Sequence, residues 1–216
     1  MKKLLFFLFA TASLYAAPQA VVFDYGGVLA KPNRDVAIKF LCRSLHISAE
    51  ELKKTKPERE AFFKNGQSEK EFWLQFALQK NIELPEDWTA NFSAAMKTAL
   101  GTKATMFALV DELKKQQIPV GLLSNVNERS ARFIRSFGFY SPFDPCLLSC
   151  ELGMEKPNPK IFQILVEKMQ LSPHDIVFID DLPENIAAAK KVGIDAILFK
   201  SSKQIRKALE KRGLLQ

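Results

Sequence analysis

Hydrophobic residues follow two different patterns along this chain. Short continuous apolar runs at 20–23, 118–123, 146–149, 176–179 and 196–199 have the length and composition of buried strands. From residue 102 onward these runs alternate with amphipathic stretches of helical period. Repeated strand–helix units with continuous apolar strands predict an α/β fold, in which helices cover both faces of a parallel sheet.

The chain between the first and the second apolar run has a helical pattern only. Ser48 and Ser68 each begin a capping box, and Pro57 and Pro85 each mark the expected start of a further helix. No strand pattern occurs between residues 33 and 100, so this segment predicts a small all-helical bundle. The bundle is inserted into the α/β core directly after the first strand.

The first 17 residues have the pattern of an export signal. Two lysines precede a short apolar run that ends in small residues, and the run is too short for a stable membrane span. We therefore expect a signal peptide at 1–17, a core domain made of 18–32 and 101–216, and a helical cap at 33–100. The protein would then be exported, periplasmic or secreted. A cytoplasmic protein or one anchored by its N-terminus remains an alternative.

Charge and cysteine content narrow the possible partners. The formal net charge is +7, but Lys and Arg alternate with acidic residues and form no basic block with interleaved aromatic residues. This pattern argues against nucleic acid as a partner and favours small anionic molecules. The three cysteines, Cys42, Cys146 and Cys150, contain no Cys-x-x-Cys pair, so neither a disulfide framework nor a zinc site is predicted. Nothing in the sequence indicates an oligomeric state.

Polar side chains follow three of the predicted strands. Because the carboxyl ends of parallel strands meet at one edge of a sheet, we expect these side chains to share one pocket. Three carboxylates in one pocket repel each other unless a cation lies among them, and such oxygen ligands suit Mg²⁺. The residues concerned are Asp24, Ser124, Asn125, Asp180 and Asp181, together with Lys156 in a loop before a helix.

Each of these residues also has a purely structural interpretation when it is taken alone. Gly26–Gly27 could form the turn of a surface hairpin, with Asp24 as a turn residue. Asp180–Asp181 could cap the following helix, and Ser124–Asn125 could form a turn. Lys156 could lie in an ordinary exposed loop. The order of these residues along the chain, each at or beside the end of a strand, favours the shared pocket.

Four motifs, taken in order and spacing, resemble those of the haloacid dehalogenase-like (HAD) superfamily. They are Asp24, Ser124, Lys156 and Asp180–Asp181. The resemblance extends from about residue 21 to about residue 200, and the sequences around the last three motifs are similar to the branch that contains α-D-glucose-1-phosphate phosphatases. It implies a three-layer, Rossmann-like core with a parallel sheet and an inserted helical cap of the C1 type.

The resemblance also implies a reaction. Asp24 would attack the phosphorus of a small phosphorylated metabolite, such as a sugar phosphate, and water would then hydrolyse the aspartyl-phosphate. Ser124 and Asn125 would hold phosphoryl oxygens through a hydroxyl group and a backbone N–H. Lys156 would neutralise charge on the phosphoryl group and on the nucleophile.

A magnesium ion is the cofactor that the resemblance implies. Asp24, Asp181 and the carbonyl oxygen of Gly26 would bind the ion, while Asp180 would hold either a metal-bound water or Lys156. Phosphatases of the superfamily usually have an Asp at the position of Gly26, where it serves as general acid and base, although the glucose-1-phosphatase-like branch also has glycine. Without that carboxyl group, a contribution of ~10²–10⁴-fold to the rate is missing.

Two alternatives to a phosphatase remain open. One is a metal-independent 2-haloacid dehalogenase, but Tyr25 lies one place earlier than the tyrosine of that motif, and the pair Asp180–Asp181 favours a metal ion. The other is a weakly active or non-catalytic protein of this fold that binds a phosphometabolite or a protein. Gly26 keeps this second alternative open.

Overall fold

The computed structural model of this chain describes residues 18–215. Its strands are β1 (Ala20–Phe23), β2 (Val120–Ser124), β3 (Cys146–Leu148), β4 (Ile176–Asp180) and β5 (Asp195–Leu198). They form one five-stranded sheet of order β3-β2-β1-β4-β5, and all of its strand pairs are parallel. β1 is central, and its Val22 pairs with Gly121 of β2 and Phe178 of β4. The predicted α/β fold is thereby confirmed, and the hairpin interpretation of Gly26–Gly27 is wrong because β1 has parallel neighbours on both sides.

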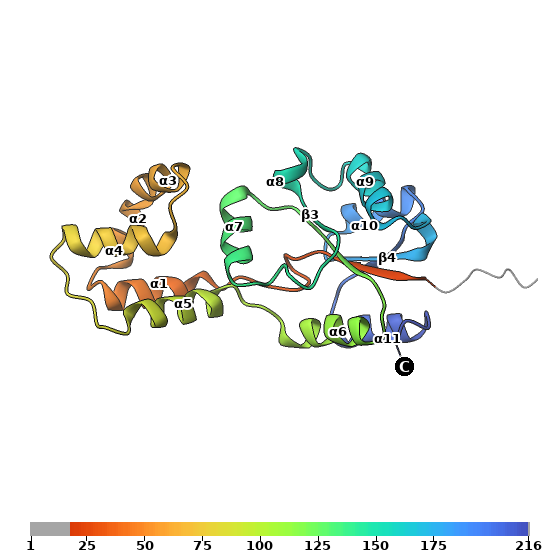
Figure 1. Cartoon of the computed structure of the whole chain (residues 1–216), viewed down its shortest axis with the longest axis horizontal. Coiled ribbons are helices and arrows are strands. Elements are labelled where there is room, and N and C mark those ends of the chain that lie inside the picture. Colours follow the sequence, from red (N-terminus) through yellow and green to blue (C-terminus); the bar gives the residue numbers. More distant parts are fainter. Residues whose placement is uncertain (1–17, 216) are drawn as a thin grey trace, which may run out of the picture.

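Helices cover both faces of this sheet, which gives three layers (Figure 1). The core helices are α6 (Ala104–Lys115), α7 (Glu128–Ser136), α8 (Ser149–Leu152), α9 (Pro159–Met169), the 3-10 turn η1 (Pro173–Asp175), α10 (Pro183–Lys191) and α11 (Ser202–Glu210). Successive side chains of a strand point to opposite faces. Val21 and Phe23 therefore join the apolar cluster that contains α6 and α11, whereas Val22 joins the cluster that contains α9 and α10. Burial on both faces explains why β1 is apolar at every position.

The insert after β1 is helical throughout, as predicted. Its helices are α1 (Arg34–Ser44), α2 (Ala49–Lys54), α3 (Lys56–Lys64), α4 (Glu69–Gln79) and α5 (Trp88–Ala99). The capping boxes of Ser48 and Ser68 are both present at the starts of α2 and α4. The apolar faces of the helices meet around Trp73, whose side chain is completely buried. The cap therefore has a hydrophobic core of its own.

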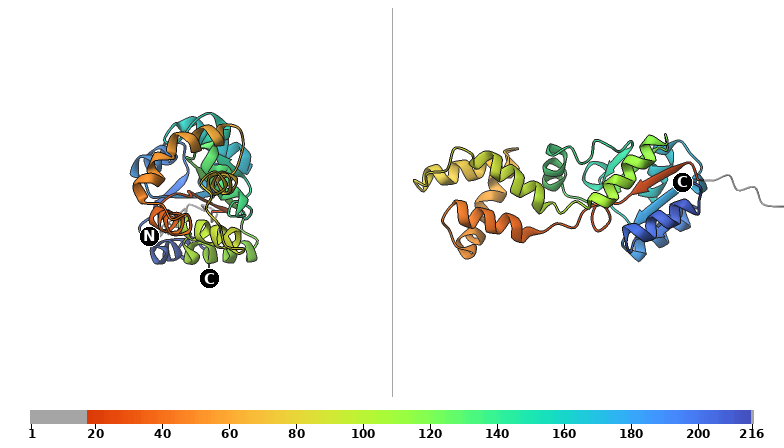
Figure 2. Two further views of the ribbon diagram at one scale, coloured as in Figure 1. Left: turned by 90° about the vertical axis from the view of Figure 1, so that its left-hand side faces the viewer. Right: turned by 90° about the horizontal axis from the view of Figure 1, so that it is seen from below.

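Two chain segments connect the cap to the core, and they pair with each other. Figure 2 shows the cap and the core lying end to end, with both segments crossing between them. Ala30 forms an antiparallel bridge with Thr102, and the N–H of Lys31 donates to the carbonyl oxygen of Gly101 at 2.9 Å. Gly101 has φ +61°, and a Cβ there would lie 2.0 Å from the carbonyl oxygen of Lys31. Only glycine permits so close an approach of the two segments.

The structure differs from the sequence-based expectation at two helix starts. The helix expected from Pro85 begins at Trp88, because the N–H of Trp88 donates to the carbonyl oxygen of Pro85 at 2.9 Å and closes a separate turn. Ser149, expected as the last residue of a strand, begins the short helix α8. The expected signal peptide, residues 1–17, lies outside the described residues. Within residues 18–215, no helix is both long enough and apolar enough to cross a membrane.

Candidate active site

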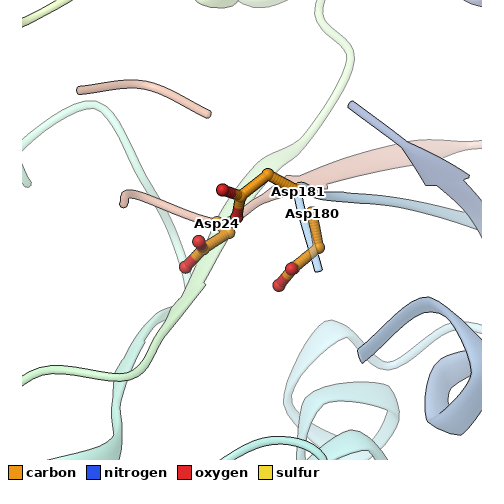
Figure 3. Close-up of side chains that lie close together, drawn as sticks. All are labelled: Asp24, Asp180 and Asp181. Carbon is orange, nitrogen blue, oxygen red and sulfur yellow. The ribbon is translucent and has the colours of Figure 1, made fainter. Parts of the chain in front are cut away.

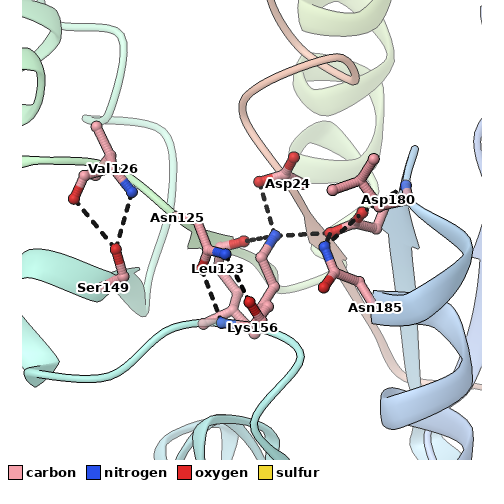
Figure 4. Close-up of polar contacts among 9 residues, drawn as sticks. Asp24, Leu123, Asn125, Val126, Ser149, Lys156, Asp180 and Asn185 are labelled. Carbon is pink, nitrogen blue, oxygen red and sulfur yellow. Dashed lines mark hydrogen bonds and ion pairs between the residues drawn. The ribbon is translucent and has the colours of Figure 1, made fainter.

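A buried ammonium group joins two carboxylates at the carboxyl end of the sheet (Figure 4). Nζ of Lys156 lies 2.8 Å from Oδ1 of Asp24, which follows β1, and 2.7 Å from Oδ2 of Asp180, which ends β4. It also donates to the carbonyl oxygen of Leu123 at 2.8 Å. All three N–H bonds of the ammonium group are therefore used. The side chain of Lys156 is 1% exposed, so the exposed-loop interpretation of this residue is wrong.

The side chain of Asn125 holds the backbone of Lys156 in place. Its Nδ2 donates to the carbonyl oxygen of Lys156, and its Oδ1 accepts from the N–H of Lys156, both at 2.8 Å. This reciprocal pair joins the loop after β2 to the loop after α8. The expected contact of the Asn125 backbone N–H with a phosphoryl oxygen stays a prediction, and the amide side chain has the additional task of positioning Lys156.

Asn185 positions Asp180, a role that the sequence alone does not predict. Its Nδ2 lies 3.0 Å from both carboxylate oxygens of Asp180, and the N–H of Leu182 donates to the same carboxylate at 2.9 Å. Asp180 is completely buried, and Asn185 is 2% exposed. Of the two tasks expected for Asp180, the structure shows the contact with Lys156.

Three carboxylates at this edge are close enough to share one cation (Figure 3). Asp24, Asp180 and Asp181 each have an oxygen atom within 4.8 Å of those of the other two. The carbonyl oxygen of Gly26 accepts no hydrogen bond from any residue between 18 and 215. The preceding carbonyl oxygen, that of Tyr25, accepts a hydrogen bond from the N–H of Ala30. A set of oxygen donors with an unused carbonyl group fits a hard cation such as Mg²⁺.

Gly27 allows Asp181 to approach this turn. Gly27 has φ +71°, and a Cβ at this position would lie 1.9 Å from Oδ2 of Asp181. A side chain at Gly26 would meet only Oδ2 of Asp24, at 3.9 Å. The two adjacent glycines therefore differ: Asp181 leaves no room for a side chain at the second position, whereas the first position has space.

The electrostatics of the pocket also favour a bound cation. Burial raises the pKa of Asp24 from 3.8 to about 6, although the Lys156 ammonium group opposes this rise. Burial, together with the neighbouring charge of Asp180, also raises the pKa of Asp181. The raised pKa values mean that the protein alone disfavours the charged forms of Asp24 and Asp181, and a divalent cation between them would favour those forms.

Ser124 ends β2, the strand next to β1, and is 3% exposed. Its hydroxyl group forms no hydrogen bond with any described residue, so it is available to a ligand. A phosphoryl group that touches Asp24 would find this hydroxyl group at the end of the neighbouring strand.

Lys103 is a further cation at the site, and the sequence alone does not predict its position there. Its Nζ donates to the carbonyl oxygen of Gly27 and lies 4.3 Å from the centre of the Phe199 ring. Burial lowers the pKa of Lys103, and the negative charge of Asp181 opposes this effect. No motif or periodic pattern marks this lysine, because it belongs to the linker that returns from the cap.

The cap contacts the core at α7, the helix that follows the Ser124–Asn125 loop. Nη2 of Arg129 lies 2.5 Å from Oε2 of Glu69 in α4, and its guanidinium group lies 3.9 Å from the centre of the Phe63 ring. A cavity of about 160 Å³ lies between these elements, and Gln67 of the cap contributes to its wall. The cap is thus held next to the loops that carry the site.

Fold and site together define a protein with a three-layer α/β core and a cluster of carboxylates at the carboxyl end of its parallel sheet. A family model of haloacid dehalogenase-like hydrolases matches residues 18–193. The chain therefore belongs to the haloacid dehalogenase-like hydrolase family.

Curated relatives include both long multidomain proteins and proteins of similar size. The chain is 28% identical over 211 residues to acyl-CoA dehydrogenase family member 10 of Mus musculus, a match that covers 89% of this chain and 19% of that protein. For bifunctional epoxide hydrolase 2 of Sus scrofa, the identity is 26% over 222 residues, with 90% of this chain and 39% of the relative covered. The chain thus spans only a minor part of these two proteins. This chain is also 26% identical over 190 residues to D-ribitol-5-phosphate phosphatase of Bacteroides thetaiotaomicron. That match covers 81% of this chain and 88% of the enzyme.

Solved structures share the fold over nearly the whole chain. A predicted HAD-like family hydrolase from Porphyromonas gingivalis has a TM-score of 0.56 and 27% identity, with 93% of this chain and 100% of that chain covered. A variant of a HAD family enzyme from Bacteroides thetaiotaomicron, in complex with magnesium and inorganic phosphate, has a TM-score of 0.52 and 23% identity. That match covers 85% of this chain and 94% of the other and concerns the fold.

Proposed function

We propose that this protein is a Mg²⁺-dependent phosphatase that hydrolyses a small phosphomonoester through an aspartyl-phosphate on Asp24. The observation that carries the proposal is the contact of Asp24 with the buried ammonium group of Lys156, beside two further carboxylates. Similarity to D-ribitol-5-phosphate phosphatase over 88% of its length supports this class of reaction and a phosphorylated metabolite, such as a sugar phosphate, as substrate.

The residues of the chain divide the work of phosphoryl transfer. A carboxylate oxygen of Asp24 attacks phosphorus, and the bond between phosphorus and the leaving oxygen breaks. The hydroxyl group of Ser124 holds an oxygen of the phosphoryl group, and the ammonium group of Lys156, which is bonded to Asp24, neutralises charge on the phosphoryl group and on the nucleophile. Water then attacks phosphorus, the bond between phosphorus and Asp24 breaks, the carboxylate is restored, and the proton that the water loses passes to solvent. Gly26 offers no side chain that could protonate the leaving oxygen, so this proton comes from solvent.

Asp24, Asp181 and the Gly26 carbonyl oxygen are the groups that would hold Mg²⁺. When bound, the ion would neutralise charge that the phosphoryl oxygens and Asp24 bring together. Asp180 contributes indirectly, since it already holds Lys156. Phosphoryl transfer depends mainly on such positioning and charge neutralisation.

The export proposal concerns residues 1–17. We propose that these residues direct the protein out of the cytoplasm. Outside the cytoplasm, the protein would act on a small metabolite and not on nucleic acid. Fractionation of cells that express the full chain tests this proposal: the expected result is a shortened protein in the exported fraction, and a full-length protein in the cytoplasm contradicts it.

Hydrolysis of p-nitrophenyl phosphate by the full-length protein is the direct test of the reaction. The assay compares Mg²⁺ with EDTA, and Asp24→Asn with the control Asp111→Asn, which changes an exposed carboxylate on α6. This aryl leaving group departs without an acid, so Gly26 does not conceal a working nucleophile. We expect turnover that requires both Mg²⁺ and Asp24. Turnover of a 2-haloacid in EDTA would identify a dehalogenase instead, and binding of phosphate without any turnover would identify a non-catalytic protein.

A further inference from the structure

Lys103 reaches the candidate metal site from the linker that leaves the cap. It immediately precedes α6, and its backbone N–H donates to the carbonyl oxygen of Leu29 at 2.8 Å. The adjacent Thr102 forms the bridge to Ala30, so the backbone of this linker is fixed against the segment that enters the cap. The base of the Lys103 side chain is therefore held in a defined position.

Two groups hold the other end of the side chain. Its ammonium group donates to the carbonyl oxygen of Gly27 and lies over the ring of Phe199, 4.3 Å from the ring centre. Such a position over an aromatic face is attractive for a cation. Phe199 is itself fixed, because its N–H donates to the carbonyl oxygen of Asp180 at 2.8 Å. Lys103 therefore contacts, through Phe199, the end of β4, where Asp180 and the candidate metal ligand Asp181 lie.

The turn that Lys103 contacts carries one candidate ligand and touches another. The carbonyl group of Gly26, which accepts no hydrogen bond from any described residue, belongs to the peptide unit just before Gly27. The Cα of Gly27 lies so close to Asp181 that an added Cβ would overlap the carboxylate. A hydrogen bond to Gly27 therefore restrains the direction of the Gly26 carbonyl group and the space that Asp181 occupies.

We propose that Lys103 is a positioning residue, which preforms the Mg²⁺ site by holding the Gly26–Gly27 turn against Asp181. This inference rests on the proposed function, because it assumes that Mg²⁺ binds at this site. Partners that orient metal ligands typically change metal affinity by about 10–100-fold when they are removed. Simple electrostatics predicts the opposite sign, since removal of a positive charge beside a cation site should tighten Mg²⁺ binding. The sign of the change therefore distinguishes positioning from charge.

The test is a titration of the full-length protein with Mg²⁺ alone, followed by the rise in Tm and by calorimetry. Lys103→Met removes the hydrogen bond and the charge, whereas Lys103→Arg keeps a charged donor. Lys31→Met is the matched control, because it removes the same charge from an exposed side chain of the other linker. We expect Lys103→Met to raise the Kd for Mg²⁺ about tenfold or more and Lys103→Arg to restore most of the affinity. Lys31→Met should leave the Kd unchanged or lower it.

Each result decides between the alternatives. An unchanged or lowered Kd in Lys103→Met overturns the inference, and so does an equal loss in Lys31→Met. If Lys103→Met does not fold in EDTA, Phe199→Leu replaces it: this variant keeps the lysine, removes its aromatic support and should also raise the Kd. A wild-type protein that binds no Mg²⁺ refutes the proposed metal site and the inference together. A wild-type protein that binds Mg²⁺ and hydrolyses phosphate, with Lys103→Met unaffected, refutes the inference alone.

Discussion

Replacing Asp24 by Asn should abolish hydrolysis and, without a divalent metal, make the protein more stable. The Asp24 side chain is only 11% exposed, and burial is the largest cause of the rise in its pKa from 3.8 to about 6. A folded-state pKa above the unfolded value means that the folded chain favours the neutral form. At neutral pH, ionised Asp24 therefore lowers the free energy of unfolding, and a neutral side chain of the same shape removes that cost.

The magnitude follows from the two pKa values. The difference between 3.8 and about 6 corresponds to about 3 kcal/mol, at about 1.4 kcal/mol per pKa unit. For a chain of this length, 1 kcal/mol changes Tm by roughly 2–4 °C, so Asp24→Asn should melt roughly 6–12 °C above the wild type at pH 7. The cost is absent below pH 3.8, grows as the pH rises to about 6 and is constant above that value.

The assay is thermal unfolding in EDTA between pH 4 and pH 8, with Asp111→Asn as the control for an exposed carboxylate. We expect the difference in Tm between Asp24→Asn and the wild type to shrink as the pH approaches 4. Added Mg²⁺ should also reduce the difference, because it stabilises the wild type and not a variant that lacks a ligand. A variant that melts at or below the wild-type temperature at pH 7 in EDTA would refute this reasoning, as would a difference that does not depend on pH.

Three further substitutions have definite expected outcomes. Gly27→Ala should abolish the Mg²⁺-dependent rise in Tm, because the added Cβ would overlap Asp181. The control Gly213→Ala, at φ +72° with open space around it, should cost only about 1–2 kcal/mol of stability. An equal Mg²⁺-dependent rise in Tm in the two variants would contradict the steric argument. Gly26→Asp should raise kcat on alkyl phosphates about tenfold or more and leave turnover of p-nitrophenyl phosphate nearly unchanged, since only the alkyl leaving group needs a proton; a parallel change on both substrates would exclude acid catalysis by the new side chain. Lys156→Met should remove hydrolysis and lower Tm by roughly 6–20 °C in EDTA, because it leaves Asp24 and Asp180 buried without their cation, at a cost of about 3–5 kcal/mol, whereas in Asp24→Asn the ammonium group keeps Asp180 as its partner. A wild-type Tm in Lys156→Met would show that the ammonium group does not stabilise the fold.

The fold could be predicted because its signals are local and periodic. Val21 and Val22 point to opposite faces of the sheet, and both are buried, so a continuous apolar run was sufficient evidence for a strand covered on both sides. Ser48 and Ser68 formed their capping boxes because that interaction involves only neighbouring residues. Once the parallel strands were assigned, the common edge at which Asp24 had to lie followed from the geometry of the sheet.

The positioning residues could not be predicted, because their roles depend on contacts between distant segments. Asn185 had a weak signal, as a polar residue in the first turn of a helix after an acid pair, but its spacing fits an exposed helix face equally well. Asn125 was expected to bind the ligand through its backbone, and only the position of the loop after α8 shows what its side chain does. Lys103 lies 76 positions after Gly27 in the sequence, and the whole cap lies between the two residues. Periodicity contains no information about such a contact.

The glycine pair after Asp24 shows that the difference between local signals and contacts of distant segments also affects the interpretation of function. In the sequence Gly26 and Gly27 are one turn signal, and either could be explained by backbone conformation. In the structure only Gly27 has a positive φ and a carboxylate against its Cα, whereas Gly26 has space for a side chain. The absence of an acid at Gly26 is therefore not imposed by packing, and the rate for each substrate should depend on how readily its leaving group departs without a proton. Turnover measured across phosphomonoesters with leaving groups of different pKa should accordingly fall steeply in the wild type and less steeply in Gly26→Asp.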